Sequence, residues 1–499
     1  MTDDRPSPRP RAGVAHPGTP TDADAGRPAL TAADLAGLTG GVIVRASARP
    51  IRGAAVDSRL VRPGELFVAL AGERTDGHRF VGDAVRAGAA GILVSEVVPT
   101  ADLAGLGDVT VIGVPDTLAA LQAIAAGWRA RFDPLVVGVT GSIAKTSTKE
   151  AIATVLAADR RTLRSEGNQN NEIGLPLTLL RLAPEDEAAV LEMGMYVGGE
   201  IRDLARMARP SIGVVTAVLG VHLSRIGTLD AVEDAKAELV EALPPDGVAI
   251  LNADDPRVRR MAGRTAARVL DYGFAADAAV RAEDVTSAGL DGMRFALRLP
   301  KLAGRVPVAI PALGRLSVHN ALAGAAVGFA AGMTPDAIAA ALAGGWSAPH
   351  RGEVVRAGGI TIVDDAYNAS PASVVAALEL LAGLPGRRLA VLGEMLELGE
   401  AAGEGHRAVG RAAAGVCDLL CVVGAGPGPQ AMAAGAREAG LPGPRILLVA
   451  DRSTAAERLS SVLEPGDVVL VKASRGVALE VVVEALVAAL GGTPAGDGR

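Results

Sequence analysis

The stretch VVGVTGSIAKTSTKEAI, residues 136–152, decides the fold of this chain. It reads as a buried strand ending at Gly138, a tight turn through Gly141 and a helix that starts around Lys145. Backbone N–H groups at such a turn hold phosphate oxygens, and the helix N-terminus adds positive potential. Lys145 can reach the terminal phosphates and Thr146 supplies a hydroxyl suited to Mg²⁺. The stretch therefore predicts a phosphate-binding loop at the edge of a parallel sheet.

The strict pattern G-x-x-x-x-G-K-[ST] fails at two positions of this stretch. Val139 and Ala144 stand where it has glycine. An ordinary strand–turn–helix without a ligand is therefore the alternative interpretation of these residues taken alone.

Strand and helix patterns alternate on both sides of this segment. Residues 29–112 hold short strands and turns followed by a helix–strand pair, and the alternation restarts near residue 346. Apolar runs of this kind separated by Ala-rich helices predict doubly wound parallel sheets. We expect an α/β chain of three domains behind a disordered tail: tail 1–28, amino-terminal domain 29–112, central domain 113–345 and carboxy-terminal domain 346–493. The apolar runs expected as strands are 134–139, 188–194, 211–218 and 247–253 in the central domain, and 360–365, 387–393, 419–426, 445–450 and 467–474 in the last.

Composition narrows the class of protein. A chain of 499 residues is too long for one hydrophobic core. Its apolar runs end well before the ~20 residues of a membrane span, and the tail lacks the apolar stretch of a signal peptide, so we expect a cytoplasmic protein. A net charge of -7 argues against nucleic acid as a partner. Cys417 and Cys421 lie in an apolar run, which favours core packing over a zinc site.

Lysine is rare in this chain. The only lysines are Lys145, Lys149, Lys236, Lys301 and Lys472, while arginine supplies the other basic side chains. A chain biased towards arginine is expected to keep lysine where a compact or deprotonatable amine is required.

Several polar residues end the predicted strands, where ligands bind in such sheets. Glu192 and His222 end two central strands and are candidate metal ligands, although a solvated Glu and a structural His are the alternatives. Lys236 lies in a helix among acids, where it would ordinarily be a solvated lysine paired with Glu233 or Glu238.

The last domain offers a second group of polar residues at strand ends. Asp364 and Asp365 end one strand and suit contacts to a ribose or a small polar substrate. Arg351 upstream is a candidate cation for phosphate. Another strand ends in Lys472, Ser474 and Arg475, which are suited to an anionic substrate.

Taken together, these segments resemble the Mur ligases of peptidoglycan synthesis over residues ~50–480. The ordered motifs that carry the resemblance are DSR 57–59, TDGHRF 75–80, TGSIAKTSTKE 140–150, EGNQNNEIGLPLTLLRL 166–182, EMG 192–194, VHLSRIG 221–227, AKAEL 235–239, NADD 252–255, HNALA 319–323, HRGE 350–353, DDAYNASP 364–371, VLGEMLELGE 391–400 and KASRG 472–476.

The resemblance implies an ATP- and Mg²⁺-dependent ligase that joins a carboxylate to an amine through an acyl phosphate. By position, it implies catalytic roles for Lys145, Lys236, His222 and Glu192. The metal ligands would be Thr146, Glu192, His222 and a CO₂-derived carbamate on Lys236. The nucleotide would contact Gly141, Ser142, Ala144, Lys145, Thr146, Ser147, Asn320, Arg351 and Asp365. The nucleotide-sugar peptide and the amine would contact Ser58, Arg59, Asn168, Asn170, Asn171, Tyr367, Asn368, Lys472, Ser474 and Arg475.

Within the family, DDAYNASP and GNQNNEIG are similar to the members that add D-alanyl-D-alanine to UDP-N-acetylmuramoyl-tripeptide. A ligase that adds a diamino acid would carry a DYAHTP-like segment and a DNPR-like acceptor motif, and folylpolyglutamate synthases lack the DSR and DGH motifs. A catalytically inactive relative that binds the nucleotide-sugar peptide is the remaining alternative. We expect a monomer.

Four residues depart from the family pattern: Ala144 and Ala473 replace glycines, and Ala217 and Ser370 replace asparagines. A glycine before the loop lysine would allow a positive φ angle. Because the other residues expected at the site are retained, we expect the loop to accommodate Ala144 by keeping its φ negative.

Overall fold

The computed structural model describes residues 27–72, 75–95, 105–220 and 226–491. The chain divides into two compact units, residues 1–124 and 125–499. The predicted tail 1–28 lies almost entirely outside the described residues. No helix in the described ranges is long and apolar enough to cross a membrane.

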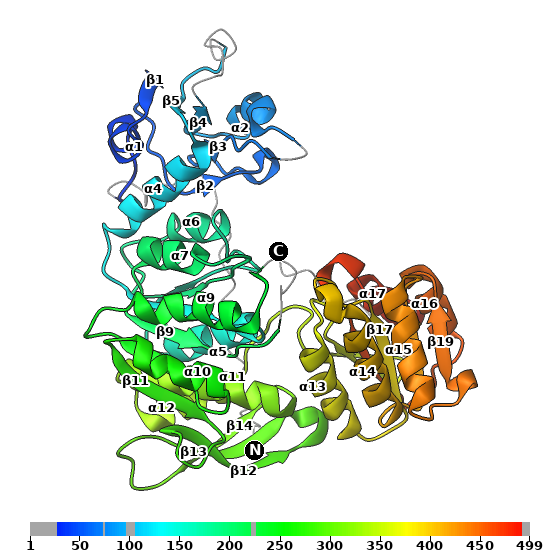
Figure 1. The fold of residues 1–499 in the computed structure, drawn as a ribbon. Helices are drawn as coiled ribbons and strands as arrows, with labels where there is room; N and C mark the ends of the chain where they lie inside the picture. Colours follow the sequence, from blue (N-terminus) through cyan, green and yellow to red (C-terminus); the bar gives the residue numbers. More distant parts are fainter. Residues whose placement is uncertain (1–26, 73–74, 96–104, 221–225, 492–499) are drawn as a thin grey trace, which may run out of the picture. The chain divides into compact units, whose positions relative to one another are not determined.

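The first unit contains a five-stranded sheet in the order β1-β5-β4-β3-β2 (Figure 1). β1 pairs antiparallel with β5, and the other neighbouring strands are parallel. The predicted helix–strand pair is confirmed by α2 and β4. The bounds are α1 Ala32–Thr39, β1 Val42–Arg45, β2 Ala54–Ala55, β3 Leu66–Val68, α2 Val81–Arg86, β4 Gly91–Ser95, β5 Thr110–Val114 and α4 Thr117–Arg129, which continues into the second unit.

The second unit begins with a nine-stranded sheet in the order β14-β13-β12-β11-β10-β9-β6-β8-β7. The strands from β7 to β12 are parallel, as the alternation predicted. The strands are β6 Leu135–Thr140, β7 Thr162–Arg164, β8 Ala188–Glu192, β9 Ile212–Val215, β10 Val248–Asn252, β11 Arg268–Gly273, β12 Val280–Ser287, β13 Met293–Arg298 and β14 Val306–Ile310. The helices are α5 Lys145–Ala157, α6 Gly174–Leu179, α7 Glu200–Ala208, α9 Leu229–Glu241, α10 Pro256–Arg260, α11 Gly314–Ala330 and α12 Pro335–Ala343.

An antiparallel extension of this sheet was not predicted. β12, β13 and β14 follow one another as antiparallel neighbours. Buried and more exposed residues alternate along β13, so this strand presents one face to the core and one outwards. Such half-polar strands lack the continuous apolar runs that identified the parallel strands.

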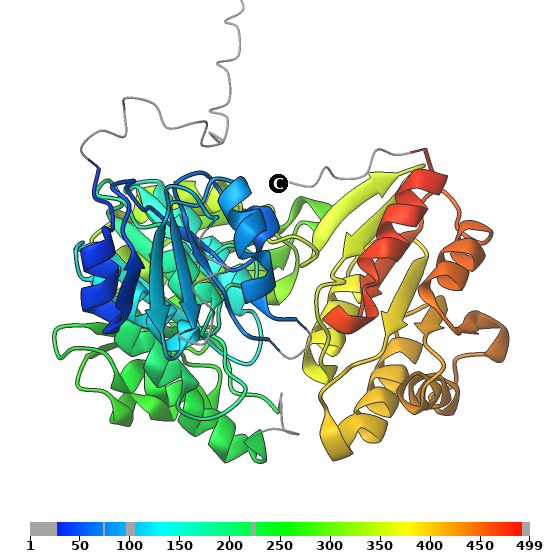
Figure 2. The ribbon, with the colours of Figure 1, turned by 90° about the horizontal axis from the view of Figure 1, so that it is seen from above.

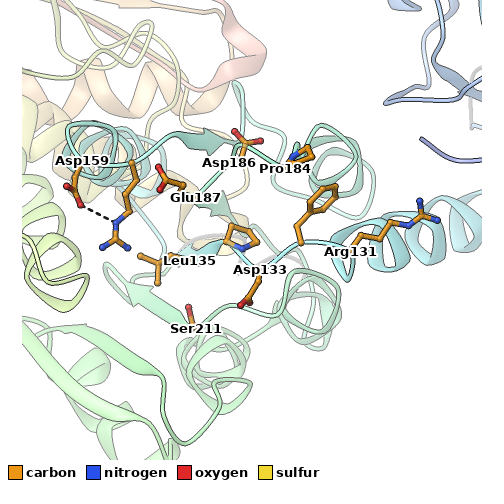
Figure 3. A pocket seen from close by; sticks show the side chains of 11 residues that line it. Arg131, Asp133, Leu135, Asp159, Pro184, Asp186, Glu187 and Ser211 are labelled. Atoms are coloured by element: carbon orange, nitrogen blue, oxygen red, sulfur yellow. Dashed lines mark hydrogen bonds and ion pairs between the residues drawn. The ribbon is translucent and has the colours of Figure 1, made fainter. Parts of the chain in front are cut away.

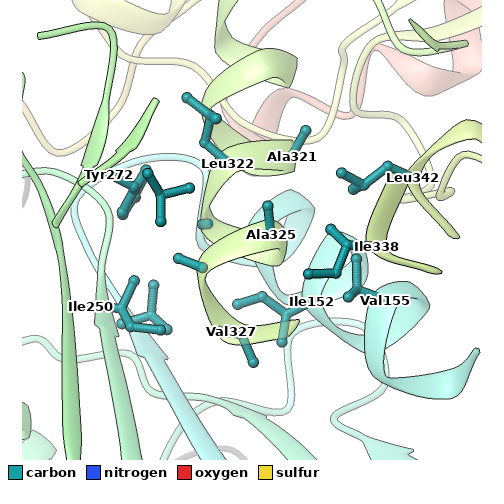
Figure 4. Close-up of a cluster of buried hydrophobic side chains, with 14 of the residues drawn as sticks. Ile152, Val155, Ile250, Tyr272, Ala321, Leu322, Ala325, Val327, Ile338 and Leu342 are labelled. Atoms are coloured by element: carbon teal, nitrogen blue, oxygen red, sulfur yellow. The ribbon is translucent and has the colours of Figure 1, made fainter. Parts of the chain in front are cut away.

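Helix α11 forms the centre of the main core (Figure 4). It is buried from Val318 to Gly328 apart from His319, and most of these residues are small. The strand residues Ile250 and Tyr272 lie to one side of it, and α5 and α12 contribute Ile152, Val155, Ile338 and Leu342. Small side chains let helices approach closely: a Cβ on Gly328 would lie 2.7 Å from a methyl group of Val155. This packing fixes α5, whose first turn carries the phosphate loop.

The last part of the chain forms a six-stranded sheet in the order β15-β16-β20-β17-β18-β19. All neighbours are parallel except β15 and β16. Figure 2 shows α17 running along this sheet. The bounds are β15 Glu353–Ala357, β16 Ile360–Asp364, α13 Pro371–Ala382, β17 Arg388–Gly393, α14 Ala402–Ala414, β18 Leu419–Val423, α15 Pro427–Glu438, β19 Ile446–Val449, α16 Arg452–Ser460, β20 Val468–Lys472 and α17 Glu480–Ala489.

The prediction of core packing for the two cysteines is confirmed. Cys417 and Cys421 are both buried and unpaired, and burial raises the pKa of each thiol to about 12. Each predicted strand of this sheet is present and is followed by a helix, so the α/β class is confirmed.

Candidate active site

The loop between β6 and α5 connects a buried strand to the positive end of a helix. Gly141 has φ 152°, and a Cβ there would lie 1.8 Å from Oγ1 of Thr216. That hydroxyl donates to the carbonyl of Ile143 at 2.7 Å, and the amide of Ser142 donates to the carbonyl of Ala217 at 2.8 Å. The end of β9 therefore holds the loop in a turn that only glycine fits at position 141.

Ala144 adopts the left-handed conformation, with φ 63° and ψ 0°. The expectation of a negative φ at this position is wrong. α5 begins immediately after it, and the amide of Thr148 donates to the carbonyl of Ala144 at 2.8 Å, so Ala144 caps the first turn. The turn geometry imposes the positive φ and the alanine side chain makes this conformation strained.

Lys145 and Thr146 follow this turn. The ammonium group of Lys145 donates to the carbonyl of Gly141 at 2.7 Å, which holds it over the loop. The surrounding protein lowers the pKa of Lys145 by desolvation, and Glu192 opposes this shift. The hydroxyl of Thr146 donates to Oε2 of Glu192 at 2.8 Å.

Glu192 ends β8 and is 2% exposed. Its second oxygen, Oε1, accepts from Nδ2 of Asn170 at 2.8 Å. The structure thus brings together three residues predicted for the site, Thr146, Asn170 and Glu192, from three separate segments. A hydroxyl beside a carboxylate at a phosphate loop is a donor set suited to Mg²⁺.

Two further metal ligands were predicted from the resemblance, His222 and a carbamate on Lys236. His222 lies in residues 221–225, outside the described residues. Elsewhere in the described chain, no group of three His, Cys, Asp or Glu residues is placed to hold a metal ion. Within the described residues, Thr146 and Glu192 are the candidate ligands of a magnesium site.

Lys236 is buried on α9, with 2% of its surface exposed. Its interpretation as a solvated lysine paired with an acid is wrong. Glu233 binds Arg257 and Arg260, and Glu238 accepts from the amides of Gly199 and Arg202. Burial lowers the pKa of Lys236 well below 10.5, and the positive charge of Lys145 adds to the shift. Among the described residues no hydrogen bond or ion pair holds its amine, and an uncharged amine is a nucleophile.

The other residues predicted to contact nucleotide are placed as follows. Asn320 is buried on α11 and its Oδ1 accepts from the hydroxyl of Thr148 at 2.9 Å. The hydroxyl of Ser142 donates to the carbonyl of Leu219 at 3.0 Å. Ser147 is partly exposed in the first turn of α5.

The loop that follows β7 carries the three asparagines predicted to meet substrate. Asn168 is exposed, and its carbonyl accepts from the amide of Asn170 at 2.7 Å. Oδ1 of Asn171 accepts from the amides of Ile173 and Gly174, so this residue holds the turn that leads into α6. Asn171 therefore has a structural role that the sequence did not indicate.

At the end of β16 the two predicted aspartates face different partners. Asp364 is buried, and its Oδ2 lies 2.7 Å from Nδ1 of His350. Burial raises the pKa of Asp364, against the effect of His350. Asp365 accepts from Nζ of Lys472 at 2.6 Å, and the same ammonium donates to the carbonyl of Asn368 at 2.8 Å. His350 was not predicted as a site residue, because the sequence gives no signal of its contact with Asp364.

Two predicted arginines lie close to the ring of Tyr367. The guanidinium carbon of Arg351 is 3.9 Å from the ring centroid of Tyr367, and that of Arg475 is 5.3 Å away. Ser474 is buried, and its hydroxyl accepts from the amide of Leu396 at 2.9 Å. These residues gather guanidinium and hydroxyl groups at the carboxyl ends of β16 and β20.

In the first unit, Ser58 and Arg59 lie in a short 3-10 helix capped by Asp57. Arg59 forms a 2.6 Å ion pair with Asp57 and is otherwise exposed. This pairing lowers the pKa of Asp57 through the side-chain hydrogen bond from Arg59.

A wide surface depression lies elsewhere on the second unit (Figure 3). Its lining includes Leu135 at the start of β6, Glu187 just before β8 and Ser211 just before β9. It therefore opens at the amino ends of the strands, at the edge opposite the phosphate loop. None of the residues predicted for the site lines it.

Comparison with known proteins agrees with this geometry. Models of three domains match the chain: the Mur ligase family, catalytic domain at residues 50–129, the Mur ligase middle domain at residues 139–328, and the Mur ligase, glutamate ligase domain at residues 350–475. The chain is 38% identical to the UDP-N-acetylmuramoyl-tripeptide–D-alanyl-D-alanine ligase of Mycobacterium tuberculosis, over 92% of this chain and 98% of that protein.

Two solved structures are similar over most of the chain. The crystal structure of MurF from Acinetobacter baumannii superimposes with a TM-score of 0.81 at 27% identity, covering 93% of this chain and 99% of that one. MurF ligase from Thermotoga maritima, solved in complex with ADP, gives a TM-score of 0.77 at 30% identity, covering 88% and 98%.

Proposed function

The chain belongs to the Mur ligase family, and we propose that it joins D-alanyl-D-alanine to UDP-N-acetylmuramoyl-tripeptide at the expense of ATP. The contact between Thr146 and Glu192, next to the loop lysine Lys145, carries this proposal. The reaction requires a loop that binds the ATP phosphates and a carboxylate that can hold a metal ion. This contact places such a carboxylate, that of Glu192, next to the loop. Bound Mg²⁺ would neutralise charge on the ATP phosphates as the substrate carboxylate becomes an acyl phosphate.

The chain's own residues position the reactants in this reaction. The amides of the 141–146 turn and the ammonium group of Lys145 hold the phosphates. Thr146 and Glu192 would hold the metal, with His222 and a carbamate of Lys236 as further ligands. Asn320, Arg351 and Asp365 would contact the nucleotide. Because this catalysis consists mainly of positioning and charge neutralisation, these contacts account for most of what the protein must supply.

The carbamate proposal is supported by the environment of Lys236. Carbamate formation needs an uncharged amine, and burial favours the uncharged form. The reaction forms a bond between Nζ and the carbon of CO₂ and releases one proton. The product is an anionic carboxylate on a residue whose amine has no partner among the described residues.

Residues of each unit are proposed to contact the substrates. Ser58 and Arg59 would contact the nucleotide sugar, and Asn168, Asn170 and Asn171 lie on a loop that would meet its peptide. The amine and the growing product would contact Tyr367, Asn368, Lys472, Ser474 and Arg475. The domains 29–112, 113–345 and 346–493 would then each contribute to one reaction in a cytoplasmic monomer.

Phosphate release in the presence of ATP and Mg²⁺ tests this function. We expect release only when UDP-N-acetylmuramoyl-tripeptide and D-alanyl-D-alanine are both present. Turnover with a free diamino acid on the shorter dipeptide precursor would identify a diamino-acid ligase instead. Binding of the nucleotide-sugar peptide without phosphate release would identify an inactive relative.

A further inference from the structure

Lys149 lies on α5, one turn after Lys145, and its side chain is fully buried. Its ammonium group donates to the carbonyl of Ser165 at 2.5 Å and forms a 2.8 Å ion pair with Glu150. A buried ammonium group is costly to desolvate unless it is paired and hydrogen-bonded. Both requirements are met here, so the charge is held at one fixed place.

Glu150 connects this charge to the next strand. Its other oxygen lies 2.9 Å from Nε of Arg164, the last residue of β7. Lys149 and Arg164 therefore bind one carboxylate from two sides. This arrangement fixes the end of β7 against the first turns of α5. The loop 165–171 begins at this end of β7.

Ser165 connects Lys149 to Glu192. Its carbonyl accepts from Lys149, and its hydroxyl accepts from the amide of Glu192 at 3.2 Å. Its own amide donates to the carbonyl of Val190 at 3.0 Å. Ser165 is fully buried, so these hydrogen bonds have no competition from water.

The far end of the same loop returns to Glu192. Asn170 donates through Nδ2 to Oε1 of Glu192, and its carbonyl accepts from the amide of Gly194 at 2.7 Å. The loop therefore contacts the backbone of Glu192 at one end and its carboxylate at the other.

We propose that Lys149 is a positioning residue that fixes the loop 165–171 and thereby orients the carboxylate of Glu192 towards Thr146. The proposal rests on the proposed function, because it takes Glu192 to be a ligand of the magnesium ion. A compact ammonium group suits this role, since it offers three donors in a space closed to solvent. It also accounts for a lysine in a chain that otherwise uses arginine.

The coupling between Mg²⁺ and ADP tests this proposal without turnover. ADP affinity is measured by calorimetry on the full chain, with Mg²⁺ and with a chelator. In Lys149→Met we expect the affinity without Mg²⁺ to match the wild type, because the 141–146 loop is intact. The gain in affinity on adding Mg²⁺ should fall about tenfold, the factor expected for losing one charge-assisted hydrogen bond.

Arg129→Met is the matched control. Arg129 is another buried cation that binds backbone carbonyls, those of Ala208 and Phe132, and within the described residues it forms no hydrogen bond or ion pair with the loop 165–171. Its loss should lower the melting temperature and leave the magnesium-dependent gain unchanged. If Lys149→Met behaves like this control, Lys149 is a structural residue and the proposal is wrong.

A second variant tests the proposal if Lys149→Met does not fold. Ser165→Ala removes the acceptor for the amide of Glu192 with little change in volume, and it should also reduce the magnesium-dependent gain. An unchanged gain in Ser165→Ala overturns the proposal. Absence of ligase turnover in the wild type would contradict the proposed function alone, since the coupling between ADP and Mg²⁺ can still be measured.

Discussion

Replacing Ala144 with glycine tests whether the phosphate loop is strained. Ala144 has φ 63° and ψ 0°, a conformation that disfavours a Cβ by roughly 1–2 kcal/mol. Glycine removes this strain. It also gives the unfolded chain more freedom, which costs about 0.4–1 kcal/mol. The net expectation is a gain of ~0.5–1 kcal/mol in the free energy of unfolding.

The strain at residue 144 can be present both without and with ATP, or it can arise only when ATP is bound. In the first case the gain appears in the stability of the protein without ligand, and the affinity for ATP is unchanged. In the second case Ala144→Gly tightens ATP binding by up to about tenfold, since ~1.4 kcal/mol corresponds to one decade. Unfolding measured at saturating Mg²⁺ and ADP contains both contributions.

Denaturant unfolding of the wild type and the variant, with and without saturating nucleotide, is the assay. Ala157→Gly provides the control, because Ala157 is an exposed residue at the end of the same helix. There glycine should lower stability by up to ~1 kcal/mol. If Ala144→Gly is destabilised as much as Ala157→Gly, with nucleotide and without it, residue 144 is not strained.

Three further predictions concern the same site. Gly141→Ala should abolish ADP binding in calorimetry, because its Cβ would lie 1.8 Å from Oγ1 of Thr216; binding at wild-type affinity would show that the loop can open. Lys236→Met should abolish turnover while the protein stays folded, and stripping CO₂ from the wild type should lower activity reversibly. At pH values between the lowered pKa of Lys236 and 10.5, the amine is uncharged in the folded protein and protonated in the unfolded chain. In CO₂-free buffer the free energy of unfolding of the wild type should therefore rise with pH in this range, by up to about 1.4 kcal/mol per pH unit. Lys236→Met should lack this contribution, and an equal slope in both proteins would contradict a lowered pKa.

The parallel strands and the phosphate loop could be predicted from sequence because their signals are local. An apolar run of four to six residues followed by glycine indicates a buried strand and a turn, and α5 begins at Lys145 as expected. Glu192 was placed correctly at a strand end for the same reason. The antiparallel strands β13 and β14 were missed because buried and more exposed residues alternate along them, so neither forms a continuous apolar run.

The surroundings of the lysines could not be predicted in the same way. Lys236 lies four residues or fewer from several acids, which is the pattern of a solvated helix face. In the fold, arginines and backbone amides distant in sequence bind Glu233 and Glu238, and α9 turns Lys236 inward. The positive φ of Ala144 could not be predicted from the sequence either, because the loop is held by residues that follow β9.

The charges around Lys145 give a physical reason for chemistry at Lys236. The amine of Lys236 is buried near the ammonium group of Lys145, and this like charge is one of the causes that lower its pKa. Two cations in such surroundings repel each other, so Lys236 is held in the form that reacts with CO₂. Conversion to a carbamate would replace the amine with an anion, and the interaction with Lys145 would become attractive. Burial disfavours any charge at position 236, but the positive charge of Lys145 disfavours an ammonium group and would stabilise a carboxylate there. Such a carbamate would add a second carboxylate to that of Glu192 for a magnesium site.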